Sequence, residues 1–191
     1  MGIGNTICPA CRRIVITLGE VYPTAHGGVS PRGMPALVYP KGISRSPIPS
    51  EVPPEFATDY REACLVLPDS EKASAALSRR CLQYLLREKA GINRGDLANE
   101  IQQVLDSRQL PGHLAEDLDA IRNIGNFAAH PIKATHTGEI VDVEPQEAEW
   151  LLNLLEGLFD FYFVQPARAK AKRDALNAKL QSAGKPPMKK P

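Results

Sequence analysis

The sequence has no run of about 18 or more uncharged apolar residues, which excludes a transmembrane helix. It also lacks an apolar stretch of the signal-peptide kind near its start, so a cytoplasmic location is expected. Only four of the 191 residues are cysteine, which excludes a disulfide scaffold. There is no phosphate-binding glycine loop, no serine nucleophile motif and no carboxylate cluster for two metal ions. The remaining composition, 43% hydrophobic and 24% charged, is that of a globular protein with one ordinary domain and appendages.

Charge is balanced over the whole chain but not along it. The formal net charge is +1. From Gln165 onward, eight basic residues accompany one acidic residue, which gives residues 165–191 a charge of +7 and leaves −6 for residues 1–164. A basic segment of this kind could bind RNA or a membrane surface by charge alone, or it could be only a solvated extension of the domain. We expect this tail to begin as a helix and to end in a disordered Lys/Pro-rich stretch.

Proline and glycine set residues 1–54 apart from the rest. This stretch holds nine of the 17 prolines and seven of the 14 glycines, which is incompatible with helices of normal length. Residues 14–18 and 36–39 are predicted to be short strands, paired as a hairpin across Gly27-Gly28. Residues 40–54 are predicted to be an extended linker, because residues before proline avoid the helical region.

From residue 55 the apolar residues recur with a helical period. The pattern predicts five helices joined by short loops, at about residues 55–67, 70–90, 96–108, 112–130 and 145–164, the last continuing into the basic tail. On the second helix, Ala73, Leu77, Cys81 and Leu85 are expected to face the core. The predicted fold is therefore mainly α, a helical bundle over residues 55–164 preceded by a small ribbon-like β segment.

The fourth predicted helix carries the most chemistry. Its core face is expected to hold Leu114, Leu118, Ile121, Gly125 and Ala128. Beside that face runs a second row, each residue four apart from the next: Arg122, Asn126 and His130. A permanent cation, an amide and a titratable imidazole are thus expected along one flank of the helix.

The run from Ile121 to Pro131 resembles the signature of a bacterial family, the domain of unknown function 4145. Further matching segments occur upstream in the order that the family shows: Tyr39-Pro40, Val52-Pro53, residues 59–63 and residues 75–82. The resemblance covers roughly residues 36–164. It implies a helical bundle of the HEPN superfamily, in which that family is placed.

Many HEPN proteins are metal-independent ribonucleases that work as dimers, so the resemblance implies a ribonuclease or ribonuclease-like homodimer acting in phage defence or stress response. In such a site His130 would be the base and Arg122 would stabilise the charged phosphorane, while Asn126 would orient the imidazole or the phosphate. The usual motif separates arginine and histidine by four to six residues, whereas seven lie between Arg122 and His130.

An alternative stays open for the same three residues. Arg122, Asn126 and His130 could form a structural clamp that bonds neighbouring helices, since histidines at helix ends often bond the last carbonyls. The protein would then be a non-catalytic binding or regulatory module that docks a protein partner or a nucleotide. A nuclease needs Arg122 and His130 exposed in one cleft, whereas a module leaves them bonded internally.

Cys8-Pro9-Ala10-Cys11 has the spacing of half a zinc site, because a tight turn can aim two thiolates at one metal ion. Zinc needs two more ligands, and Cys64 and Cys81 are expected on helical core faces. His26 is the only other candidate nearby. Zinc is therefore the one cofactor that the sequence allows, with an incomplete site: the pair could bind zinc within the single chain, be a relic, or form a zinc site shared between subunits.

Overall fold

The computed structural model describes residues 1–43, 45–124 and 145–189, without the side chains of residues 123, 124 and 145. It divides into two compact units, residues 1–46 and residues 47–191, which we treat separately. No helix among the described residues combines the length and apolarity that crossing a membrane requires.

The first unit is a three-stranded antiparallel sheet in the order β1-β2-β3, formed by β1 (Gly2–Ile7), β2 (Ile14–Pro23) and β3 (Val29–Tyr39). The predicted hairpin is confirmed as β2 and β3. In its turn Gly27 has a φ of +78°, a left-handed conformation that glycine adopts without steric cost. Strand β1 was not predicted, because its Gly-Ile-Gly-Asn sequence carries little strand propensity.

The second unit begins with four helices: α1 (Pro54–Val66), α2 (Glu71–Lys89), α3 (Leu97–Ser107) and α4 (Gly112–Ile124). Ser70 caps α2 by accepting a hydrogen bond from the Ala73 N–H at 3.3 Å. Asp96 caps α3 in the same way, accepting from the Asn99 N–H at 2.9 Å. The predicted helices match these bounds closely. The predicted continuation of the fourth helix to His130 lies outside the described residues.

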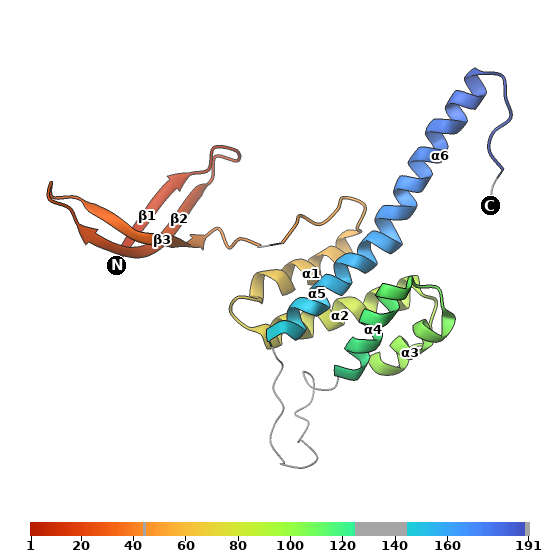
Figure 1. The fold of residues 1–191 in the computed structure, drawn as a ribbon, viewed down its shortest axis with the longest axis horizontal. Coiled ribbons are helices and arrows are strands. Elements are labelled where there is room, and N and C mark those ends of the chain that lie inside the picture. The colour runs from red at the N-terminus through yellow and green to blue at the C-terminus, as the bar shows by residue number, and fades with distance from the viewer. Residues whose placement is uncertain (44, 125–144, 190–191) are drawn as a thin grey trace, which may run out of the picture. The chain divides into compact units, whose positions relative to one another are not determined.

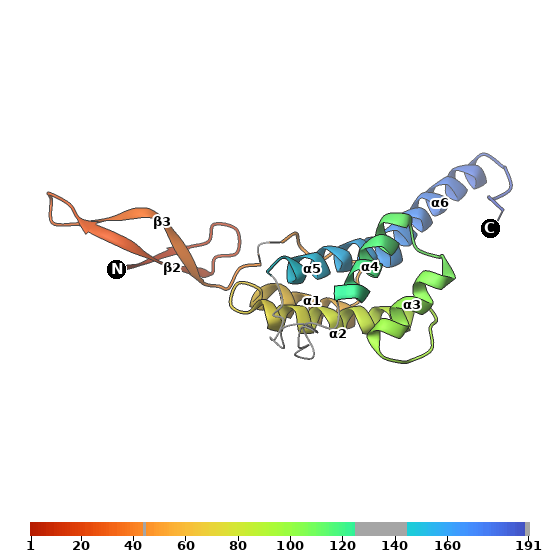
Figure 2. The same cartoon turned by 60° about the horizontal axis from the view of Figure 1, so that its bottom comes forward.

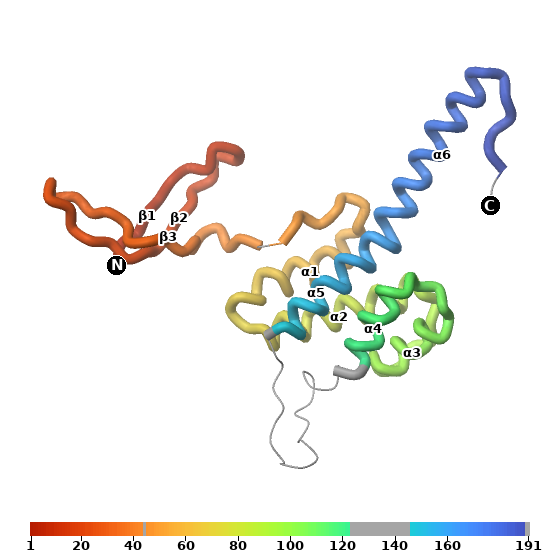
Figure 3. The backbone as a smooth tube through the Cα atoms, viewed as in Figure 1, coloured from red at the N-terminus to blue at the C-terminus, as the bar shows by residue number. Residues whose placement is uncertain are grey.

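The last helical segment runs through α5 (Pro145–Phe159), the π-helical turn η1 (Asp160–Val164) and α6 (Gln165–Ser182) without a break, as the backbone trace in Figure 3 shows. Pro166 explains why the helix widens into the π-helical turn η1. A proline lacks the N–H for the usual bond and crowds the carbonyl four residues earlier. At the end of η1 the Gln165 N–H bonds the carbonyl of Asp160, five residues back, which absorbs the disturbance without ending the helix.

The core lies where α5 packs against α1, α2 and α4, while α3 packs against α2 and α4 (Figures 1 and 2). Its largest fully buried aliphatic side chains are Leu82, Leu85, Leu86, Ile101, Leu118, Ile121, Leu152, Leu154, Leu155 and Leu158. On α2 the buried face is turned slightly from the predicted one. Ser74 and Ser78 are fully buried there, while Ala73 and Leu77 are only partly buried.

Tyr60 joins α1 to α5. Its ring is buried, with an edge-on contact to Phe159 at 5.5 Å between centroids, and its hydroxyl donates a hydrogen bond to Glu156. Burial raises the pKa of Tyr60 far above its ordinary value, and the Glu156 carboxylate raises it further. The phenol therefore stays protonated and keeps this bond at physiological pH.

Candidate functional site

The described part of α4 has the predicted orientation. Leu114, Leu118 and Ile121 are buried in the bundle, and Arg122 lies on the flank with one third of its side chain exposed. Asn126 and His130, which complete the predicted row, lie outside the described residues. Of the predicted catalytic residues, the structure therefore places Arg122.

Arg122 is bonded within the bundle. Its Nε donates a hydrogen bond of 2.9 Å to Asp119 one turn earlier on α4, and its Nη2 lies 2.8 Å from the same oxygen. Its Nη1 donates to Gln102 Oε1 of α3 at 2.8 Å. The guanidinium thus ties α3 to α4, which is the arrangement expected of a clamp.

The adjacent arginines on α2 differ in surroundings. Arg80 forms a two-pronged ion pair with Asp59 of α1, with Nε–Oδ2 and Nη2–Oδ1 distances of 2.7 and 2.5 Å. Arg79 is partly buried, and burial lowers the pKa of its guanidinium against the favourable charge of Glu147. Arg80 thus joins α2 to α1 through this ion pair.

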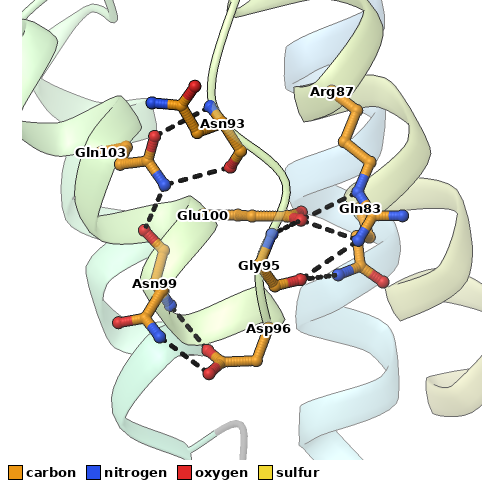
Figure 4. Close-up of polar contacts among 8 residues, drawn as sticks. All are labelled: Gln83, Arg87, Asn93, Gly95, Asp96, Asn99, Glu100 and Gln103. Carbon is orange, nitrogen blue, oxygen red and sulfur yellow. Dashed lines mark hydrogen bonds and ion pairs between the residues drawn. The ribbon is translucent and has the colours of Figure 1, made fainter.

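Sequence reasoning missed the polar cluster between α2 and α3 (Figure 4). Glu100 of α3 is fully buried, and its Oε1 accepts hydrogen bonds from Arg87 Nε of α2 and from the Gly95 N–H, both at 2.8 Å. Arg87 also donates to the Gly95 carbonyl at 3.2 Å. A charged residue in an amphipathic helix is normally assigned to the solvent side, so the pattern gave no signal of this burial.

The electrostatics of this cluster keep Glu100 ionised. Burial alone would raise the pKa of its carboxyl, but the hydrogen bonds from Arg87 and from the Gly95 N–H outweigh that effect, so the pKa is lowered. The groups in this cluster bond one another and fix the loop between α2 and α3. We therefore assign the cluster a structural role.

Cys8 and Cys11 lie together in the tight turn between β1 and β2. The Cys8 N–H donates to the Arg13 carbonyl and the Arg12 N–H donates to the Cys8 carbonyl, both at 2.9 Å. The backbone N–H groups of Cys11 and Ala10 point to the Cys8 sulfur, and together with the Cys11 side chain they lower the pKa of the Cys8 thiol. Arg12 has a φ of 59°, a left-handed conformation that is uncommon for a residue other than glycine.

Among residues 1–43, 45–124 and 145–189, no group of three or more His, Cys, Asp or Glu side chains could hold a metal ion. Cys64 and Cys81 are buried in the helical unit, as predicted, and neither is in a disulfide. The turn at Cys8 and Cys11 thus presents two thiols without further ligands among the described residues.

Helix α6 has no buried residue over its 18 positions. It carries Arg168, Lys170, Lys172, Arg173 and Lys179 against the single acid Asp174. By contrast, residues 47–164 hold ten basic and twenty acidic residues, a net charge of −10. The strongest concentration of positive charge in the helical unit is therefore this exposed helix.

The fold defines a class of protein: a helical bundle domain whose last helix extends into a basic, solvent-exposed arm, preceded by a small antiparallel sheet. A family model described as "Domain of unknown function (DUF4145)" matches residues 61–181, and the chain belongs to that family. The match begins within α1 and includes almost all of α6, so the basic helix is part of the matched domain. No curated protein and no solved structure matches the chain.

Proposed function

We propose that this protein binds RNA through helix α6, and that its HEPN-like bundle serves as a non-catalytic platform for that helix. The observation that carries the proposal is the exposure of α6: none of its residues is buried, and five cations face one acid. A helix without a buried residue gains little from packing against its own domain, so its cations are better explained by a charged partner.

The cations of α6 favour one side of the helix. At 100° per residue, Arg168, Lys172 and Lys179 fall within a 40° stripe, whereas Lys170 and Arg173 lie on the opposite half. Along the axis the stripe extends over about 16 Å, from the 1.5 Å rise per residue. A row of this length can contact several phosphates of one RNA strand.

The acidic bundle makes this helix the principal source of attraction in the helical unit. With a net charge of −10, residues 47–164 repel a polyanion. Arg122 does not offset this, because its guanidinium is already engaged by Asp119 and Gln102. Affinity for RNA should therefore depend on α6 and fall steeply with salt.

Fluorescence anisotropy with a labelled single-stranded RNA, measured at several salt concentrations, tests the proposal. We compare Arg168→Glu/Lys172→Glu with Lys170→Glu/Arg173→Glu, because both variants change the net charge by the same amount. The first should lose most of the affinity and reduce the salt slope by about 1.4, since each lost phosphate contact on a single strand contributes about 0.7. If the unaltered protein shows no salt-dependent binding, the proposal is refuted. If both variants lose the same affinity for RNA, the stripe of Arg168, Lys172 and Lys179 is not the RNA-binding side of the helix.

Ribonuclease activity is the second candidate, and the observation that favours it is the position of Arg122. This side chain keeps one third of its surface exposed and is oriented by two acceptors, as a preorganised cation would be. Incubation with RNA in the absence of metal ions separates the candidates. Cleavage that is lost in His130→Ala identifies a nuclease, whereas binding without cleavage identifies the platform.

A further inference from the structure

The small sheet has one mainly apolar face and no core of its own. The regular pairing of β1 with β2 sets Ile3 opposite Leu18, Asn5 opposite Ile16 and Ile7 opposite Ile14, so five apolar side chains and Asn5 share one face. The other face of the same two strands carries Gly2, Gly4, Thr6, Val15, Thr17 and Gly19. No described residue of the 1–46 unit is buried, and Ile3, Ile7 and Ile14 are 76%, 63% and 57% exposed.

A unit of this size without a buried residue needs further stabilisation. Domains of about 40 residues bury too little surface to offset their conformational entropy, and they usually depend on disulfides, metal ions or oligomerisation. No disulfide joins any of the four cysteines. A metal ion and oligomerisation are the other two of these means.

The cysteine turn lies at the end of this apolar face. Ile7 immediately precedes Cys8, and Ile14 immediately follows Arg13. The Cys8 N–H donates to the Arg13 carbonyl and the Arg12 N–H donates to the Cys8 carbonyl, so one short turn carries both cysteines. A tight turn of this kind can direct two cysteine sulfurs at one metal ion.

The number of ligands that zinc needs indicates what completes the site at Cys8 and Cys11. Structural zinc is bound tetrahedrally by four ligands, with Zn–S distances of about 2.3 Å. Cys8 and Cys11 supply two, and no third ligand accompanies them among the described residues. A twofold axis through the metal supplies the same pair again, and twofold dimers are the commonest oligomers.

We propose that two copies of this chain bind one zinc ion between them, each through Cys8 and Cys11, with the apolar faces that contain Ile3, Ile7 and Ile14 packed around the twofold axis. A second copy of the sheet then completes the metal site and also covers the apolar face. Arg12 and Arg13 of each copy flank the thiolates, and their positive charge offsets the net −2 of a zinc ion with four thiolates.

Zinc analysis together with light scattering on the full chain tests the proposal. The protein is purified under reducing conditions, loaded with zinc and freed of loosely bound ions. We expect 0.5 zinc ion per chain and a mass twice the 20.8 kDa of one chain. A titration of the metal-free protein with Co²⁺ should likewise end at 0.5 equivalent, with the visible absorption of a tetrahedral thiolate site.

Two pairs of variants serve as matched tests. Cys8→Ser/Cys11→Ser should lose the zinc ion, whereas Cys64→Ala/Cys81→Ala removes the other two thiols and should keep it. Ile7→Asn/Ile14→Asn should weaken dimerisation at least about tenfold by removing apolar contact area, whereas the cross-strand pair Thr6→Asn/Val15→Asn on the opposite face should not. Far-UV circular dichroism of each variant reports whether the helical unit is intact.

Three outcomes overturn the proposal. One zinc ion per monomeric chain means that the site closes within a single chain. Zinc retained equally by Cys8→Ser/Cys11→Ser places the metal elsewhere. No zinc retained by the reduced, unaltered protein means that the cysteine turn is not a metal site.

Discussion

Replacing Glu100 with glutamine measures how much the buried carboxylate contributes to the junction between α2 and α3. The substitution keeps the shape of the side chain and one acceptor oxygen for Arg87 and the Gly95 N–H. It removes the negative charge that makes these hydrogen bonds strong. Hydrogen bonds to charged groups contribute about 1.5–3 kcal/mol, so we expect a loss of about 2 kcal/mol.

Arg87→Met removes the cation instead and leaves the carboxylate buried. Removing one partner of a fully buried pair typically costs about 3–5 kcal/mol. Arg87 is 29% exposed, so water screens part of the interaction, and we expect a loss of about 2–3 kcal/mol. The double variant should lose less than the sum of the two single losses, because each removes the same ion pair.

The dependence on pH gives the sharper test. The pKa of Glu100 is lowered in the folded protein, so its stabilising effect is full above the ordinary glutamate pKa of about 4.3 and is lost as the pH falls through the lower, folded value. Glutamine does not titrate. The stability difference between the unaltered protein and Glu100→Gln should therefore be full at pH 7 and shrink toward strongly acidic pH.

Urea unfolding followed by the helical signal in circular dichroism measures these differences. In thermal unfolding at neutral pH, Glu100→Gln should lower the melting temperature by about 4–8 °C, because each kcal/mol shifts it by about 2–4 °C for a protein of this size. A loss below about 0.5 kcal/mol would show that the pair is energetically neutral. A difference that stays constant as the pH falls would show that the carboxylate is not the source of the stabilisation.

Three further variants test single contacts by urea unfolding. Ser70→Ala should cost about 1 kcal/mol by removing the cap of α2, and Ser70→Asp should restore it; an unchanged midpoint in the alanine variant argues against the cap. Tyr60→Phe should cost about 1–2 kcal/mol by removing the bond to half-buried Glu156, and a gain in stability would contradict this. Arg122→Met should cost about 0.5–1 kcal/mol if Arg122 is a clamp, whereas unchanged stability favours a functional role.

The local features of the helices could be predicted from the sequence. Helix periodicity and capping residues act within one or two turns, so the starts of α2 and α3 follow from Ser70 and Asp96 alone. The burial of Leu114, Leu118 and Ile121 follows from their spacing in the same way. The hairpin of β2 and β3 was also accessible, because its strands and turn are contiguous in sequence.

Contacts between distant segments could not be predicted in this way. The period of α3 gives Glu100 no reason to be buried, since the group that makes its burial tolerable, Arg87, belongs to another helix. The buried face of α2 shifts to Ser74 and Ser78 because neighbouring helices approach there. Pro166 signals a helix end by the usual rule, yet the π turn at Asp160–Val164 lets the helix continue.

The continuation of the helix past Pro166 determines where the positive charge of the helical unit lies. Eighteen helical residues span about 27 Å at 1.5 Å per residue, and Figures 1 and 2 show α6 leading away from the other helices. The Debye length at physiological salt is about 8 Å. Lys179, about 21 Å along the helix from Gln165, therefore lies more than two screening lengths from the start of α6, where the −10 charge of residues 47–164 cancels its charge least. Had the chain turned back at Pro166, the same lysines would have neutralised the acidic bundle and left no basic surface for a polyanion.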